Sequence, residues 1–153
     1  MPTRIFVRSF RAADMDRILE IERASFGAAA YDRNLFAELF HNCGELFLVA
    51  LTDGRICGYM VTCMCGKRAP EAAELVSIAV NPASRGKGVA SSLLRNTLRR
   101  LRLRGVVRLS LMVKVTNKQA RRFYDKHGFE RVRKMRGYYE DGADGVLMRR
   151  AIS

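Results

Sequence analysis

Hydrophobic residues recur along this chain at two spacings, one typical of strands and one typical of helices. Alternating or continuous apolar runs predict seven strands, near residues 5–10, 46–51, 56–65, 73–80, 106–113, 129–135 and 146–150. Apolar positions three or four residues apart predict four helices, one over residues 89–104 and three capped by Asp14, Asp32 and Asn117. The order is strand, two helices, three strands, helix, strand, helix and two strands. It predicts an α/β fold with helices on both faces of a sheet.

Two local features refine this pattern. Asp53-Gly54 separates two strand-like runs and fits the tight turn of an antiparallel hairpin. Within the first helical run, Glu22 interrupts an otherwise apolar stripe.

The length and composition predict one soluble domain spanning residues 1–153. The chain has 153 residues and is 48% hydrophobic, which is enough for one core and too little for two ordinary domains. No apolar run approaches the roughly 20 residues of a membrane-spanning helix. Residues 1–11 also lack the apolar stretch of a signal peptide. We therefore expect a cytoplasmic protein without membrane contact.

The cysteines and histidines do not form a metal-binding pattern. Four cysteines, at positions 43, 57, 63 and 65, lack CxxC spacing, and the chain has only two histidines. We expect no metal. In a cytoplasmic protein the cysteines are expected to be reduced structural thiols.

Positive charge is concentrated in the second half of the chain. The formal net charge is +13, and more than half of the Lys and Arg residues lie between Arg85 and Arg136. Only two acids, Asp125 and Glu130, occur in that stretch. A polyanionic cofactor, an acidic protein substrate, RNA or a simply solvated basic face would each account for it.

A glycine-rich segment joins the strand near 73–80 to the long helix. It consists of Arg85, Gly86, Lys87, Gly88, Val89 and Ala90. Backbone N–H groups and the positive helix end converge there, and the two glycines let an anion approach closely. The spacing matches neither a Walker motif nor GxGxxG. The segment predicts a phosphate site.

The surrounding residues resemble the GNAT N-acetyltransferase superfamily, and most closely its ribosomal-protein-alanine (RimI-like) subgroup. The matching stretches are Ser77–Pro82, Arg85–Ala90, Leu93-Leu94, Asn117, Ala120, Phe123-Tyr124, Gly128-Phe129 and Tyr138-Tyr139. The resemblance implies a mixed, mostly antiparallel sheet of about seven strands, with about four helices. It also implies that the sheet splays between its fourth and fifth strands, here 73–80 and 106–113.

The same resemblance implies acetyl-CoA as the cosubstrate and a primary amine as the acceptor. The pyrophosphate would lie on the amides of residues 85–90. The pantetheine arm would pair with Ile78, Ala79 and Val80, and Asn117 would touch the same arm.

Two residues are candidates for acid and base chemistry. Tyr124 matches the family's helix tyrosine and is our candidate for the acid that protonates the departing thiolate. The subgroup's usual base is a glutamate on the fifth strand, but this sequence has Met112 there. Glu74 matches instead the fourth-strand glutamate of the histone-acetylating branch, and His127 is a further alternative. Proton transfer through water also stays open.

The acceptor is less well defined by the sequence. Phe26, Tyr31, Tyr138 and Tyr139 are candidates for the wall of its site, although the chain has no tryptophan where the subgroup often has Phe-Pro-Trp. A protein N-terminal α-amine or a lysine is the leading expectation. The alternatives are a polyamine or aminoglycoside acceptor, or a silent module that binds acyl-CoA or nucleic acid. Ribosome or nucleic-acid contact through the basic face, and a monomer or homodimer, are also compatible with the sequence.

Overall fold

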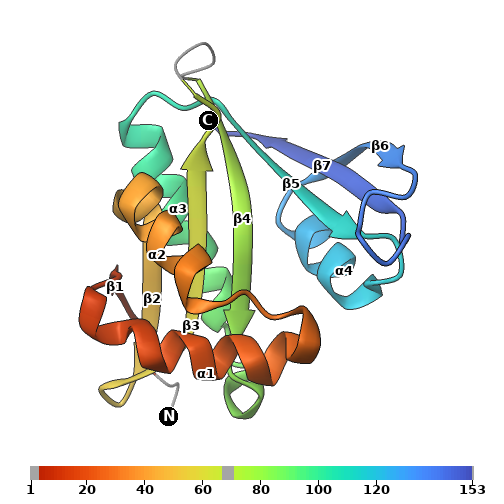
Figure 1. Cartoon of the computed structure of the whole chain (residues 1–153). Coiled ribbons are helices and arrows are strands. Elements are labelled where there is room, and N and C mark those ends of the chain that lie inside the picture. The colour runs from red at the N-terminus through yellow and green to blue at the C-terminus, as the bar shows by residue number, and fades with distance from the viewer. Residues whose placement is uncertain (1–3, 67–70, 153) are drawn as a thin grey trace. The chain divides into compact units, whose positions relative to one another are not determined.

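The computed structural model describes residues 4–66 and 71–152 and has the expected order of helices and strands (Figure 1). The strands are β1 (Phe6–Ser9), β2 (Phe47–Thr52), β3 (Arg55–Met64), β4 (Ala72–Val80), β5 (Arg108–Lys114), β6 (Glu130–Met135) and β7 (Gly145–Ala151). The helices are α1 (Met15–Phe26), α2 (Arg33–Cys43), α3 (Val89–Leu103) and α4 (Lys118–Lys126). Short 3-10 turns lie at Ala12–Asp14, Gly27–Ala29, Gly44–Leu46 and Pro82–Ser84.

The seven strands form one mixed sheet in the order β1-β2-β3-β4-β5-β7-β6. The pairs β1–β2, β2–β3, β5–β7 and β6–β7 are antiparallel. Strands β4 and β5 pair in parallel, and their register covers only Ala72–Leu75 opposite Arg108–Leu111. The mixed, mostly antiparallel α/β architecture is therefore confirmed.

The chain packs as two units. Unit 1 comprises the described residues of Met1–Cys63 and Ser77–Arg100, and unit 2 comprises those of Met64–Val76 and Leu101–Ser153. Strand β4 contributes its first half to unit 2 and its second half to unit 1. The expectation of one domain over 1–153 stays a prediction.

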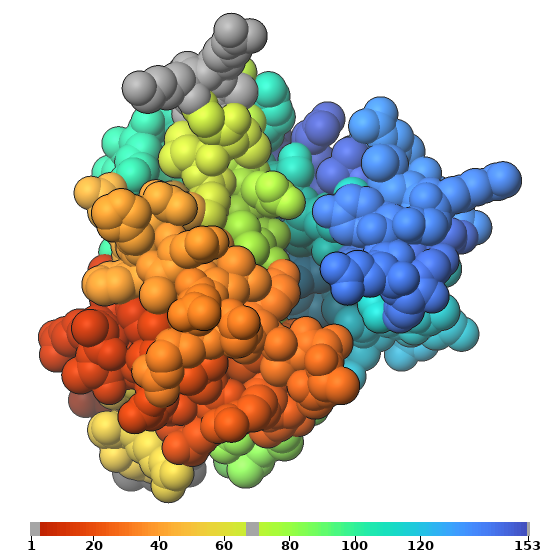
Figure 2. All heavy atoms as spheres, in the orientation of Figure 1, coloured from red at the N-terminus to blue at the C-terminus, as the bar shows by residue number. Residues whose placement is uncertain are grey.

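Unit 1 is a sheet with helices on both faces. Gly58 and Tyr59 are neighbours on β3 and therefore point to opposite faces. The Tyr59 ring lies edge-on to Phe36 of α2, with the ring centroids 5.5 Å apart. A Cβ built at Gly58 would meet Val89 and Leu93 of α3. Helices α2 and α3 thus cover opposite faces, and Figure 2 shows α1 and α2 spread over one of them.

Unit 2 is built on the β5–β7–β6 part of the sheet. Leu109, Leu111 and Val113 of β5 are buried and alternate with half-buried residues, as expected for a strand with one packed face. Tyr124 of α4 lies edge-on to Phe129, with ring centroids 5.5 Å apart, and both residues are buried. This apolar layer fixes the position of α4 within unit 2.

Most of the predicted caps and turns are confirmed. Asp53 and Gly54 both have positive φ, 52° and 76°, as the tight hairpin between β2 and β3 requires. The Asp32 side chain accepts a hydrogen bond from Leu35 N at 2.9 Å and caps α2. The Asn117 side chain accepts one from Ala120 N at 3.1 Å and caps α4.

The predicted capping role of Asp14 is wrong. Asp14 precedes α1 but makes no capping hydrogen bond to that helix. Its carboxylate instead pairs with the Arg8 guanidinium at 2.8 Å and accepts from Arg11 N. Burial opposes ionisation of Asp14, but these bonds outweigh it and lower its pKa. Asp14 therefore ties β1 to the start of α1.

The expectation that all four cysteines are reduced is also wrong. Cys43 at the end of α2 and Cys63 near the end of β3 form a disulfide. Cys57 is a buried free thiol and Cys65 an exposed one. The two bonded cysteines are 20 residues apart, so only the packing of α2 on the sheet brings them together.

No helix among residues 4–66 and 71–152 is both long and apolar enough to cross a membrane.

Candidate functional site

The glycine-rich segment before α3 has the backbone that the sequence predicts for an anion site. Gly86 and Gly88 have φ values of 76° and 85°, a backbone conformation that residues other than glycine rarely adopt. A Cβ built at Gly86 would meet no atom within 4 Å. The glycine is therefore needed for its backbone conformation rather than by crowding, and the space beside it is open to a ligand.

The start of α3 directs backbone donors at this segment. Ser92 N donates to Gly88 O at 3.0 Å, and this bond begins the helical pattern of α3. The amides before it lie in the helix's first turn, where N–H groups have no acceptor within the helix. The positive end of a helix dipole acts at the same place. Buried Val89 and Leu93 hold this end of α3 on the sheet.

Two cations lie in the same segment. Arg85 and Lys87 are exposed. The Arg85 guanidinium donates to Val80 O at 3.1 Å and to Ser25 Oγ at 3.2 Å. This keeps Arg85 beside the end of β4 without neutralising its charge. An open backbone cradle at residues 85–90, a helix N-terminus and two exposed cations together fit a phosphate group.

Unit 1 brings this cradle together with the strand expected to hold the pantetheine arm. Ile78 and Val80 are half-buried, and Ala79 is buried against Gly58. Asn81 N donates to Cys57 O at 2.7 Å, which extends the contact with β3 beyond the end of β4. The chain then turns into the glycine-rich segment through Pro82–Ser84.

Unit 2 contains Tyr124 on α4. The residue is 7% exposed, and its ring lies among the rings of Phe123 and Phe129. Burial raises the pKa of Tyr124 to about 12, and Tyr139 contributes to the same shift. The phenol is therefore fully protonated at neutral pH and available as a hydrogen-bond donor. Asn117, expected to touch the cofactor, already uses its side-chain oxygen to cap α4.

Glu74 is also in unit 2 and is exposed on β4. Its neighbours in sequence, Ala73 and Leu75, are buried, so Glu74 projects from the opposite face of the strand. It is in register with Ser110 of β5. Burial raises the pKa of the nearby Cys65 thiol, and the charge of Glu74 adds to that shift.

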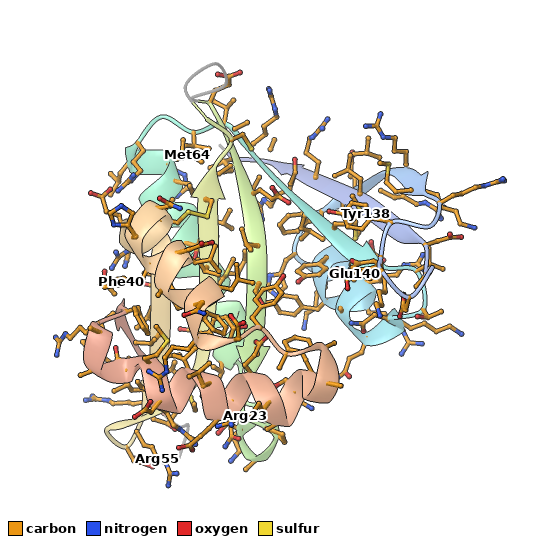
Figure 3. The ribbon with its side chains drawn as sticks, viewed as in Figure 1. Arg23, Phe40, Arg55, Met64, Tyr138 and Glu140 are labelled. Carbon is orange, nitrogen blue, oxygen red and sulfur yellow. A yellow bond between two sulfur atoms is a disulfide. The ribbon has the colours of Figure 1, made fainter. Side chains whose placement is uncertain are left out.

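Met112 lies against the loop that carries the paired tyrosines. A Cβ built at Gly145 would be 2.9 Å from Met112 Sδ and 3.4 Å from Tyr138 Cβ. Met112 therefore packs where only a glycine leaves room for it, close to Tyr138. The rings of Tyr138 and Tyr139 are edge-on with centroids 5.0 Å apart, and Tyr138, labelled in Figure 3, is 49% exposed.

The remaining acceptor candidates are in unit 1. Phe26 at the end of α1 is 42% exposed. Tyr31 lies edge-on to Phe36 at a centroid distance of 5.9 Å. Its backbone N–H donates to the buried carboxylate of Glu22 at 2.9 Å. Glu22 was not predicted as a functional residue, and its interruption of the apolar stripe is the only mark of this buried carboxylate in the sequence.

The structure contains no group of three or more potential metal ligands among the described His, Cys, Asp and Glu residues.

Comparison with known proteins gives a consistent family assignment. Residues 15–129 match the acetyltransferase (GNAT) family. The chain is 33% identical to the N-alpha-acetyltransferase RimI of Mycobacterium tuberculosis, covering 95% of this chain and 92% of that protein. It is 31% identical to an N-alpha-acetyltransferase of Saccharolobus solfataricus, and the match covers 95% of this chain and 92% of that protein. The crystal structure of Ard1 from Thermoplasma volcanium superimposes with a TM-score of 0.91 at 26% identity, covering 97% and 98%.

The family match spans well over half of the chain, and both relatives exceed 30% identity over nearly their whole length. The fold, in which β4 and β5 pair in parallel, agrees with the Ard1 structure. The chain therefore belongs to the GNAT acetyltransferase family and is an N-acetyltransferase of RimI-like type.

Proposed function

We propose that this enzyme uses acetyl-CoA to acetylate the α-amine of protein N-termini. The observation that carries the proposal is the glycine-lined segment before α3, with positive φ at Gly86 and Gly88 and open space beside Gly86. The names of the two relatives, both N-alpha-acetyltransferases, support the α-amine as acceptor. We place the enzyme in the cytoplasm, as a monomer or homodimer.

In this proposal the backbone of residues 85–90 binds the pyrophosphate of acetyl-CoA, and Ile78, Ala79 and Val80 bind its pantetheine arm. Asn117 in unit 2 is a further proposed cofactor-binding residue, through its amide NH2 group, since its oxygen is engaged in the cap. Acetyl-CoA supplies a thioester carbonyl that a neutral amine attacks. Phe26 and Tyr31 are the proposed acceptor-binding residues of unit 1. Tyr138 and Tyr139 are the proposed acceptor-binding residues of unit 2, each pair being considered within its own unit.

Tyr124 serves the departing sulfur in this proposal. A phenol with a pKa of about 12 is a weaker acid than an ordinary thiol, whose pKa is about 8.5. Full proton transfer to a free thiolate is therefore uphill. Tyr124 stabilises the developing negative charge on sulfur chiefly as a hydrogen-bond donor, which is the role that burial preserves.

The missing fifth-strand glutamate favours an α-amine over lysine. At pH 7.5 about a third of α-amines are neutral, compared with about 0.1% of lysine side chains, from their ordinary pKa values. An enzyme that has Met112 in place of the usual glutamate can therefore use the fraction of α-amine that is already neutral, for which no catalytic base is needed. Glu74, exposed on β4, is the proposed base for the α-amines that are still protonated.

Glu74→Gln is expected to lower kcat/KM several-fold, because the amide cannot accept the amine's proton. Glu130→Gln on β6 is a matched control, since Glu130 is also an exposed strand glutamate. Steady-state kcat/KM is the measurement. If both variants keep the wild-type value, the amine is deprotonated through water.

The acceptor class is tested with peptides that differ only in which amine is free. We expect acetylation of a peptide with a free α-amine and no internal lysine. A peptide with a blocked α-amine and one internal lysine should react at least about 100-fold more slowly, as should a polyamine and an aminoglycoside. Mass spectrometry locates the acetyl group. Preferential acetylation of the polyamine or aminoglycoside would replace this proposal with a small-molecule acceptor.

A second role, contact with RNA or the ribosome, is favoured by the charge on unit 2. Lys118, Arg122 and Lys126 are exposed and spaced four residues apart on α4, so they form one row. Arg131 and Arg133 of β6 are also exposed. Binding of single-stranded RNA should weaken steeply with salt and persist in Gly86→Glu. Salt-independent binding, or none at 50 mM salt, would leave this surface as a solvated face.

A further inference from the structure

A buried carboxylate lies within unit 1 where the α1 stripe would otherwise be apolar. Glu22 is 1% exposed. Its two oxygens are held separately, Oε2 by the Tyr31 N–H at 2.9 Å and Oε1 by the Tyr59 hydroxyl. The same hydroxyl lies 2.7 Å from Ser77 Oγ on β4. One carboxylate thus connects α1, the segment before α2, β3 and β4.

The energetic cost of this arrangement calls for an explanation. Burial raises the pKa of Glu22, and the hydrogen bonds from Tyr31 and Tyr59 act against that rise. Removing a carboxylate from water costs several kcal/mol, and a well-packed apolar side chain is often as stable or more stable. The burial of a carboxylate at this position therefore points to a role that an apolar residue cannot perform.

The side chains of the segment between α1 and α2 lie at the surface. From Arg23 to Leu35 every side chain is half-buried or exposed, and the next buried side chain is Phe36. Gly27 has a φ of 55°, and Ala30 N donates to Gly27 O at 3.1 Å within a single short turn. The bond from Tyr31 N to Glu22 connects this exposed segment to a buried group.

We propose that Glu22 is a positioning residue for the acceptor: it fixes the 27–32 segment and couples it, through Tyr59 and Ser77, to the β4 strand. This inference rests on the proposed function, in which Phe26 and Tyr31 form part of the acceptor wall and Ile78, next to Ser77, contacts the pantetheine arm. We call the hydrogen bonds of Glu22 to Tyr31 and Tyr59 the Glu22 clamp. Without this clamp the 27–32 segment is held less firmly, while the phosphate-binding backbone at 85–90 stays intact.

The KM for the peptide and the KM for acetyl-CoA, measured separately, distinguish this role from a general loss of stability. In Glu22→Ala the KM for an N-terminal peptide should rise about 10-fold or more, while the KM for acetyl-CoA changes less than about twofold. Glu22→Gln keeps one oxygen for the Tyr31 N–H and offers an NH2 group to Tyr59, so its peptide KM should rise less. The peptide KM of Tyr59→Phe should lie between those of Glu22→Gln and the wild type.

A second readout does not depend on activity. Hydrogen exchange at the Tyr31 amide should be faster in Glu22→Ala and near wild type in Glu22→Gln. Thr62→Val is the matched control on β3, because Thr62 Oγ1 is buried without a hydrogen-bond partner among the described residues. It removes a buried hydroxyl and should change neither readout.

The outcomes are distinguishable. If the wild-type enzyme acetylates no peptide but Tyr31 exchange still depends on Glu22, the proposed function fails and the clamp stands as a structural feature. If Glu22→Ala remains folded, with unchanged peptide KM and unchanged exchange at Tyr31, the positioning role is overturned. A fall in kcat alone, with both KM values unchanged, would also overturn it.

Discussion

Replacing Gly86 with glutamate is expected to weaken acetyl-CoA binding by at least about 100-fold. Two effects act in the same direction. A non-glycine residue at a φ of 76° strains the backbone by about 1–2 kcal/mol, and a carboxylate at this helix end repels the phosphates. Activity should fall in parallel, and binding is measured directly by calorimetry.

Gly54→Glu is the control that separates the loss of the phosphate site from the cost of backbone strain. Gly54 has the same φ of 76°, and a Cβ there would also meet nothing within 4 Å. It lies in the β2–β3 hairpin, so the same substitution carries a similar backbone cost there without a ligand nearby. Equal losses of acetyl-CoA affinity in the two variants would mean that the glycine-rich segment does not bind the cofactor.

Tyr124→Phe is expected to lower kcat by about 10-fold or more and to leave the KM for acetyl-CoA within about twofold of wild type. Phenylalanine keeps the packing against Phe129 and removes only the hydroxyl. Steady-state kinetics with each substrate varied in turn gives both numbers. Phe123→Leu is a useful control, because it alters the neighbouring ring and leaves the phenol in place. An unchanged kcat in Tyr124→Phe would remove Tyr124 from the chemistry.

The raised pKa of Tyr124 also fixes how its contribution depends on pH. The hydroxyl donates only while it is protonated, and its pKa of about 12 lies well above the ordinary value of 10. Its contribution should therefore be constant from pH 6 to pH 10 and be lost only near pH 12. The ratio of wild-type to Tyr124→Phe kcat, measured across that range, should stay level. A ratio that falls between pH 8 and pH 10 would show an unshifted phenol.

The sequence predicted those features of the fold that depend on neighbouring residues. Asp32 and Asn117 cap helices because their partners are three residues away. The Asp53-Gly54 turn and the glycine-rich bend depend on local backbone preferences, which sequence alone reveals. The strand and helix periods were readable for the same reason, since each element has one packed face.

The features that were missed depend on distant partners. Asp14 looked like a helix cap but pairs with Arg8, an alternative that becomes visible only once β1 and α1 are folded. The Cys43–Cys63 disulfide needs α2 to pack on β3. Glu22 meets Tyr59, 37 residues away, and its burial could not be foreseen from an interrupted stripe alone.

The catalytic assignments are predictions of a different kind. Tyr124 and Glu74 are predicted from their match to positions in related enzymes. The structure adds that Tyr124 is buried with a raised pKa and that Glu74 is exposed. The loss of the usual glutamate at Met112 was visible in the sequence. Glu74 is the proposed replacement, and the comparison of Glu74→Gln with Glu130→Gln tests it.

Calorimetric titration of the wild-type protein with acetyl-CoA is the most direct test of the phosphate cradle before α3. Saturable 1:1 binding is expected, with a dissociation constant within the common range for enzyme substrates of about 1 µM to 1 mM. CoA without its acetyl group should bind as well, because the cradle contacts the phosphates and not the thioester. No saturable binding of either compound up to about 1 mM would contradict the cradle and the function built on it.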